Sequence, residues 1–83
     1  MTGYKDCSIE QFNEAMRMVS ENVPVQDIPT HLLYIAFDKY CADERHLGMV
    51  SSTPYISDIR LSTKNKKKML GTELKRRGIE IQM

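Results

Sequence analysis

The 83-residue chain is poor in the residue types that mark several protein classes. It has two cysteines, Cys7 and Cys41, no tryptophan, four glycines and three prolines. A secreted domain of this size usually needs several disulfides, so two cysteines favour reduced thiols in a cytoplasmic, reducing compartment. No apolar run is long enough to cross a bilayer, and the first residues lack the apolar core of a secretory signal. We therefore expect no membrane partner.

Motifs for catalysis and for cofactors are equally scarce. His31 and His46 lie at the two ends of an apolar segment, and neither has a partner at the spacing of a catalytic triad. The residues near the end of that segment match no metal-ligand spacing; they are Cys41, Asp43, Glu44 and His46. The glycines match no phosphate-binding loop. We predict a chain that is not an enzyme, with no catalytic residues, no metal, no cofactor and no small-molecule substrate.

The composition is that of a globular domain, but the charge is unevenly distributed. Charged residues make up 28% of the chain and hydrophobic residues 41%, and this length allows a single domain over residues 1–83, with residues 1–7 expected to be disordered. Residues 1–59 carry four basic and nine acidic side chains, whereas residues 60–83 carry eight basic and two acidic ones. The net charge of +1 therefore hides a basic C-terminal segment on an acidic body, which predicts one positive surface.

Apolar spacing and capping residues predict a mainly helical fold. Ser8 opens a first helix that ends near Glu21–Asn22, and a second helix follows Pro29 and ends at Gly48. The second helix is the most apolar segment and should form the centre of the core. Its expected core residues are Leu33, Ala36, Phe37, Tyr40 and Cys41, widened by Leu32 and Ile35.

The segment 49–61 allows two interpretations. Thr53 followed by Pro54 is a good helix start, and favours a short helix that runs to Leu61. Alternatively, residues 59–61 form a short strand. We favour the short helix.

A last, basic helix is predicted over residues 63–77. Ser62 is a suitable N-cap, Gly78 is a suitable stop, and the alternating tail 79–82 resembles a short strand. The apolar residues of the predicted helix 63–77 are few and should all face the core; they are Met69, Leu70 and Leu74.

This basic helix has the strongest functional content in the sequence. Four lysines would lie in its first turns, where the helix dipole disfavours cations, so we expect an anionic partner such as phosphate there. Short polar side chains, Thr63, Asn65 and Thr72, could reach bases or the sugar-phosphate backbone. We predict nucleic-acid binding, with double-stranded DNA as the first candidate. The predicted contact residues are Lys64, Asn65, Lys66, Lys67, Lys68, Thr72, Lys75, Arg76 and Arg77.

Two other interpretations stay open for the same helix. It could be a plain solvated surface, as charge runs on small domains often are. It could also belong to a protein-interaction module whose basic helix meets an acidic partner.

Two motifs resemble a known family, the C-terminal winged-helix domain of primase–helicases of phages and mobile elements. Residues 33–41, LYIAFDKYC, resemble the aromatic-rich helix of that domain, and residues 70–78, LGTELKRRG, resemble its following helix. The resemblance extends over residues 9–82. Tyr40 replaces the usual tryptophan and Leu70 replaces a phenylalanine.

The resemblance implies a winged-helix or helix-turn-helix domain of three to four helices with at most a minimal β element. It also implies DNA binding in replication or in a mobile element, next to a replication helicase or another replication protein. Lys75, Arg76 and Arg77 fall within the matching helix, whereas the four lysines from Lys64 to Lys68 precede it. No ATPase motif is present, and too few residues follow Gly78 to build a hairpin wing. The wing could be missing, formed by residues 49–61, or cut off.

Overall fold

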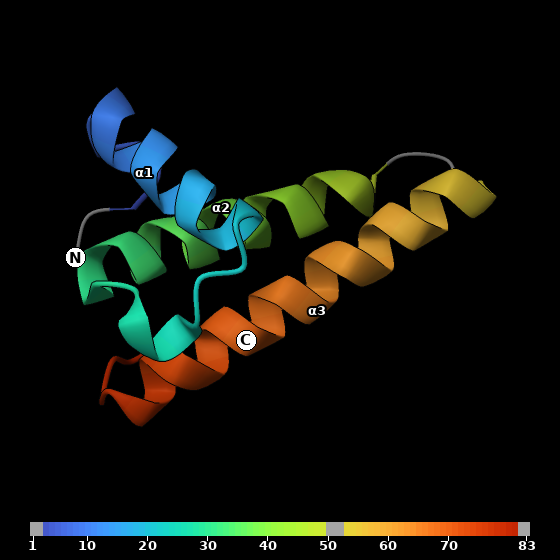
Figure 1. The fold of residues 1–83 in the computed structure, drawn as a ribbon. Helices are drawn as coiled ribbons and strands as arrows, with labels where there is room; N and C mark the ends of the chain where they lie inside the picture. Colours follow the sequence, from blue (N-terminus) through green and yellow to red (C-terminus); the bar gives the residue numbers. More distant parts are fainter. Residues whose placement is uncertain (1–2, 50–52, 82–83) are drawn as a thin grey trace.

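Three α-helices and one short 3-10 helix form the domain in the computed structural model, which describes residues 3–49 and 53–81. The elements in chain order are α1 (Ile9–Ser20), η1 (Val25–Asp27), α2 (Thr30–Leu47) and α3 (Pro54–Arg76). α2 and α3 form an antiparallel hairpin, α1 packs on α2, and η1 packs on the C-terminal half of α3 (Figure 1). The mainly helical fold is confirmed. The described residues contain no strand, so the strand expected in the tail is wrong for residues 79–81, and residue 82 lies outside the described part.

Side-chain caps start α1 and α3 where the sequence predicts. The hydroxyl oxygen of Ser8 accepts a hydrogen bond from the Gln11 N–H at 3.1 Å, and that of Thr53 accepts one from the Ile56 N–H at 3.1 Å. Each cap satisfies one backbone donor that the first helical turn leaves without a partner. Pro54 follows its cap directly, at a position where a missing N–H costs nothing.

Both helices end in the same motif. Asn22 after α1 and Gly78 after α3 have positive φ angles of 58° and 83°. The next residue in each case donates back into the helix: the Val23 N–H to the Met18 carbonyl and the Ile79 N–H to the Leu74 carbonyl, both at 3.0 Å. These are Schellman ends, in which the residue after the turn also packs on the core.

The two short elements predicted over residues 53–77 are one continuous helix, so both the break at Ser62 and the strand alternative over 59–61 are wrong. No glycine or proline interrupts the chain between Tyr55 and Leu70. The apolar stripe also continues across Ser62, because Ile56, Ile59 and Thr63 share the face of Leu70 at helical spacing. A residue that can cap a helix lies inside a helix when the apolar residues before and after it follow one continuous helical periodicity.

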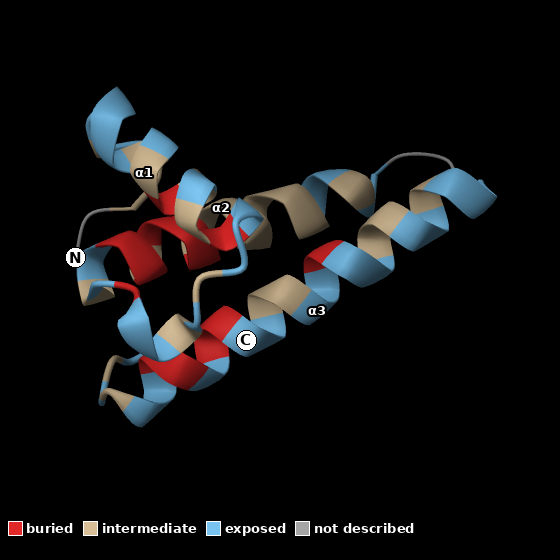
Figure 2. Ribbon diagram, viewed as in Figure 1, coloured by how far each residue is buried: buried red, intermediate tan, exposed pale blue. Residues whose placement is uncertain are grey.

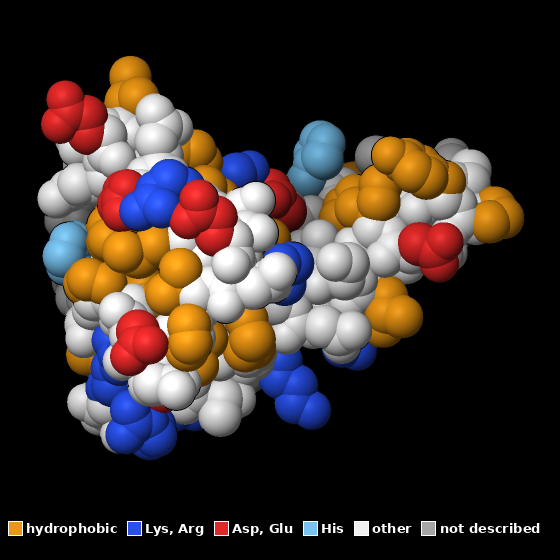
Figure 3. Space-filling view, viewed as in Figure 1, with side chains coloured by type: hydrophobic (Ala, Val, Ile, Leu, Met, Phe, Trp, Pro, Cys, Tyr) orange, Lys and Arg blue, Asp and Glu red, His pale blue; other side chains and the backbone are white. Residues whose placement is uncertain are grey.

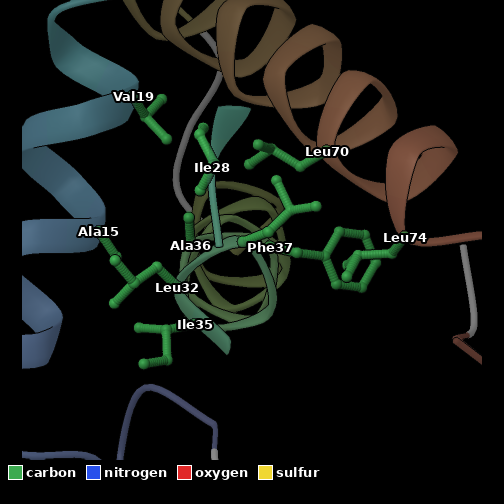
Figure 4. Packing of buried hydrophobic residues seen from close by; sticks show 10 residues of the cluster. Ala15, Val19, Ile28, Leu32, Ile35, Ala36, Phe37, Leu70 and Leu74 are labelled. Carbon is green, nitrogen blue, oxygen red and sulfur yellow. The ribbon is translucent and has the colours of Figure 1, made fainter. Parts of the chain in front are cut away.

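The core lies at the end of the hairpin that α1 and η1 cover. Leu33, Ala36, Leu70 and Leu74 have no exposed surface, and Ile28 between the helices is 2% exposed (Figure 4). Buried residues gather in this half, while the far end of the hairpin is exposed or half-buried (Figure 2). Of the other residues predicted for the α2 core, Leu32, Ile35 and Phe37 are buried, and Tyr40 and Cys41 are half-buried.

The N-terminal residues 3–7, expected to be disordered, form a turn on α2. The Tyr4 N–H donates to the Asp38 carboxylate at 3.1 Å, and the Cys7 thiol donates to the Tyr4 carbonyl at 3.3 Å. The Tyr4 ring lies near Phe12, with 6.4 Å between ring centroids. A carboxylate on α2, thirty-four residues away, therefore holds this turn in place. Residues 1 and 2 lie outside the described part.

Candidate nucleic-acid interface

Three lysines form a line along the solvent side of α3. Successive residues of an α-helix are rotated by about 100°, which places Lys64, Lys68 and Lys75 within about 40° of one another and over about 16 Å of helix. All three are exposed. No ion pair joins them to a carboxylate of the described residues. In Figure 3 several Lys and Arg side chains lie along the lower edge, where α3 runs, and acidic side chains lie towards the two ends of that edge as well as on the α1 side.

A second row of α3 residues, all uncharged, lies beside the lysine line. Asn65, Met69 and Thr72 follow one another at spacings of four and three residues, so they share one side of the helix. Together with Val25 of η1 they line a shallow hollow, which Lys68, Glu73 and Arg76 also border. Met69 is 46% exposed, so the prediction that it faces the core is wrong. Sequence reasoning missed Met69 and Val25 as site residues, although the spacing of Met69 from Asn65 and Thr72 was a usable signal.

Arg76 stands at the end of this face but is held by its own helix. Its Nε donates to both Glu73 oxygens at 2.8 Å, and its Nη2 lies 2.5 Å from Glu73 Oε2. Hydrogen bonding from Arg76, and then from Arg77, lowers the pKa of Glu73, although burial opposes the shift. The Arg76 side chain is 65% exposed, so it can still meet an anion while it pairs with Glu73.

Arg77, which the sequence predicts as a contact residue, lies apart from the lysine line and bonds within the domain. Its Nη1 donates to Thr30 Oγ1 at 2.9 Å and its Nη2 to the Val25 carbonyl at 2.9 Å, while Nε lies 3.2 Å from Glu73 Oε2. The side chain is only 16% exposed. Arg77 therefore ties the end of α3 to η1 and to the start of α2.

Lys67 and Lys66 also depart from the predicted surface. Lys67 Nζ lies 2.9 Å from Glu44 Oε2 on α2, and its side chain is 18% exposed. This ion pair links the two helices of the hairpin and keeps Lys67 out of the lysine line, so a contact of Lys67 with nucleic acid stays a prediction. Lys66 is half-buried. It lies about 160° around the helix axis from Lys68. The structure thus gathers Lys64, Asn65, Lys68, Thr72, Lys75 and Arg76 on one side of α3.

One argument for an anionic partner does not survive. Because α3 begins at Pro54, the lysines lie in the middle of the helix and do not oppose its N-terminal dipole. The same change removes the free backbone N–H groups expected near residue 63, and Thr63 itself is buried, with 7% exposure. The candidate site therefore consists of the lysine line and its neighbours alone.

Other chemistry finds little support in the described residues. Residues 3–49 and 53–81 hold no group of three His, Cys, Asp or Glu side chains that could bind a metal ion. Burial raises the pKa of the Cys41 thiol, so this cysteine is a poor nucleophile near neutral pH. None of the described helices is both long enough and apolar enough to span a bilayer.

A second, larger hollow lies between α2, α3 and the tail. Its floor includes Tyr34, Phe37 and Cys41, and its rim carries Arg45 and Lys75. Asp38 and Glu80 also line it, so its charge is mixed.

No family model, curated protein or solved structure matches this chain.

Proposed function

We propose that the chain is a non-catalytic module that binds double-stranded nucleic acid through the outward side of α3. The observation that carries this proposal is the line of Lys64, Lys68 and Lys75, exposed and without ion pairs to carboxylates of the described residues. Cations arranged in this way gain affinity by releasing counterions from phosphates. Lys66 on the other side of the helix gives a second, weaker flank.

A duplex fits this surface better than a single strand. Residues 61–77 contain no aromatic side chain, and single-strand binding without sequence preference usually depends on aromatic stacking. An α-helix, about 10–12 Å across with its side chains, matches the major groove of B-form DNA at about 12 Å. The N-terminal end of α3 projects past the core, whereas residues 64–75 lie in the half near η1 (Figure 1). Exposed side chains on that half, among them Lys64, Lys68 and Thr72, are accessible to such a partner.

The relation to the winged-helix domain of primase–helicases is part of the same proposal. It is supported by the two motifs, which fall on the paired helices α2 and α3. On this hypothesis the module acts in DNA replication or in a mobile element, next to a helicase or another replication protein. A wing built from residues 49–61 is excluded for residues 54–61, which are helical.

Fluorescence anisotropy of the full chain with a labelled duplex of about 20 base pairs tests the proposal. We expect binding at low salt that weakens linearly as the logarithm of affinity is plotted against the logarithm of salt concentration. The single strand of the same sequence should bind more weakly. Absence of binding near 50 mM salt, or affinity without a salt slope, would contradict the proposal.

A second candidate function is docking of an acidic protein segment in the hollow between α2 and α3. It is favoured by the apolar floor near Tyr34 and by the cations Arg45 and Lys75 at the rim. Replacing Arg45 with Gln discriminates the two functions, because Arg45 lies on α2 and is not part of the lysine line, although it lines the same hollow as Lys75. Docking predicts that this variant loses binding of a poly-glutamate peptide, whereas nucleic-acid binding predicts an unchanged duplex affinity.

A further inference from the structure

The outer side of α3 has a composition that discriminates between base pairs, an inference that rests on the proposed function. Asn65, Met69 and Thr72 form a row of about 10 Å along the helix, between the lysine line and Lys66. At 3.4 Å per base pair, this row spans about three base pairs of a duplex. The side chains in the row, and not the flanking lysines, would face the base edges.

The side chain of Asn65 favours adenine. It is exposed, and no hydrogen bond with another described residue occupies its amide. An amide offers one acceptor and one donor group, which match N6–H and N7 of adenine, whereas guanine presents two acceptors on its major-groove edge.

The residue that would favour guanine is not free to do so. Arginine is the usual bidentate partner of guanine, and Arg76 is the arginine at this face. Its Nε and Nη2 are already engaged by the Glu73 carboxylate. A guanine contact through the same two nitrogens would leave Glu73, whose side chain is 6% exposed, with one partner fewer.

The hollow beside Asn65 favours thymine. Val25, Met69 and the methyl group of Thr72 give it apolar surface, and the charged residues Lys68, Glu73 and Arg76 also line it. The Thr72 hydroxyl donates to the Lys68 carbonyl at 2.8 Å, so what remains for a partner is its methyl group and an acceptor lone pair. The C5 methyl of thymine is the apolar feature of the major groove, and small apolar side chains are its usual contacts.

We propose that α3 recognises A·T base pairs in the major groove of B-form DNA, with Asn65 on adenine and the Val25–Met69–Thr72 hollow on the thymine methyl. The same argument disfavours RNA duplexes, whose deep and narrow major groove excludes a helix and whose uracil lacks the methyl. The predicted target is a block of about three A·T pairs.

Anisotropy with the full chain and duplexes of equal length tests this inference. An all-A·T duplex should bind about tenfold more tightly than an all-G·C duplex, which is within the range for one bidentate base contact. Replacing every thymine with deoxyuridine removes only the methyl and should weaken binding about threefold. That arm excludes minor-groove width as the source of the preference.

Asn65→Ala should reduce the preference for the A·T duplex and leave the salt slope unchanged, and Asn13→Ala on α1 is the matched control. Equal affinity for the two duplexes, or a preference that survives both Asn65→Ala and deoxyuridine, overturns the inference and leaves the proposed function standing. If neither duplex binds near 50 mM salt, the proposed function fails and the inference fails with it.

Discussion

Neutralising the lysine line should remove most of the salt dependence of duplex binding. The variant replaces Lys64, Lys68 and Lys75 together with Gln, which keeps a long polar side chain of good helix propensity. All three are exposed and make no ion pair with the described carboxylates. The helix should therefore remain folded while its outer side loses three positive charges.

The expected magnitude follows from counterion release. Each phosphate contact contributes a slope of about −0.9 to the plot of log affinity against log salt. Three lysines that each contact one phosphate account for about −2.7, so their share of the affinity falls about fortyfold between 50 and 200 mM salt. The variant should bind more weakly at low salt. The slope of its plot of log affinity against log salt should be smaller in magnitude by about 2.7.

The assay is fluorescence anisotropy with one labelled duplex at four or more salt concentrations, with circular dichroism to verify the fold. The control for net charge replaces Lys5, Arg17 and Lys39 with Gln, of which Arg17 and Lys39 pair with carboxylates of their own helices. It loses the same formal charge from the N-terminal turn, α1 and α2. If both triple variants change the slope equally, net charge alone governs binding, and the reasoning from the lysine line is refuted.

Three further predictions concern stability and are measured by thermal or urea unfolding. Leu70→Ala should cost about 2–5 kcal/mol, because Leu70 has no exposed surface, whereas Leu61→Ala at 59% exposure should cost far less; equal losses would contradict the packing. Gly78→Ala should cost about 1 kcal/mol through its φ of 83° alone, since an added Cβ has no atom within 4 Å; an unchanged midpoint would argue against the Schellman end. The pKa of Glu73 is lower in the folded chain than its ordinary value of 4.5, so its stabilising contribution is complete above that value and is lost as the pH falls through the folded pKa. Glu73→Gln should therefore be less stable than the parent at neutral pH, and the difference should shrink as the pH falls below 4.5 and through the folded pKa; a constant difference would contradict this.

Local signals were sufficient for the helix starts and ends that depend on neighbouring residues. Ser8, Thr53 with Pro54, and Gly78 each act through hydrogen bonds or φ angles within a few residues, and each was predicted correctly. Ser62 has the same capping chemistry as Ser8, but the apolar stripe passes through it. The prediction failed because Ser62 can cap a helix only if no helix precedes it. Packing of α3 on α2 determines that the helix continues through Ser62.

Long-range partners explain why two predicted contact residues, Lys67 and Arg77, lie away from the lysine line. Arg77 bonds to Val25, more than fifty residues earlier, and Lys67 pairs with Glu44 on another helix. Local residue spacing cannot predict these distant partners, but it can predict that the two side chains point towards the core. Lys67 and Arg77 each lie three residues from Leu70 or Leu74, on the buried side of α3, and that periodicity predicts inward side chains. The remaining candidates avoid this side and stay together.

The central claim is that the outward side of α3 contacts the duplex, and amide chemical-shift changes measured by NMR during a duplex titration test it most directly. The account predicts that the largest changes cluster at Lys64, Asn65, Lys68, Thr72 and Lys75, while the amides of α1 change little. Changes centred on α1 or on the hollow between α2 and the tail, with α3 from residue 64 to residue 75 unaffected, would contradict it.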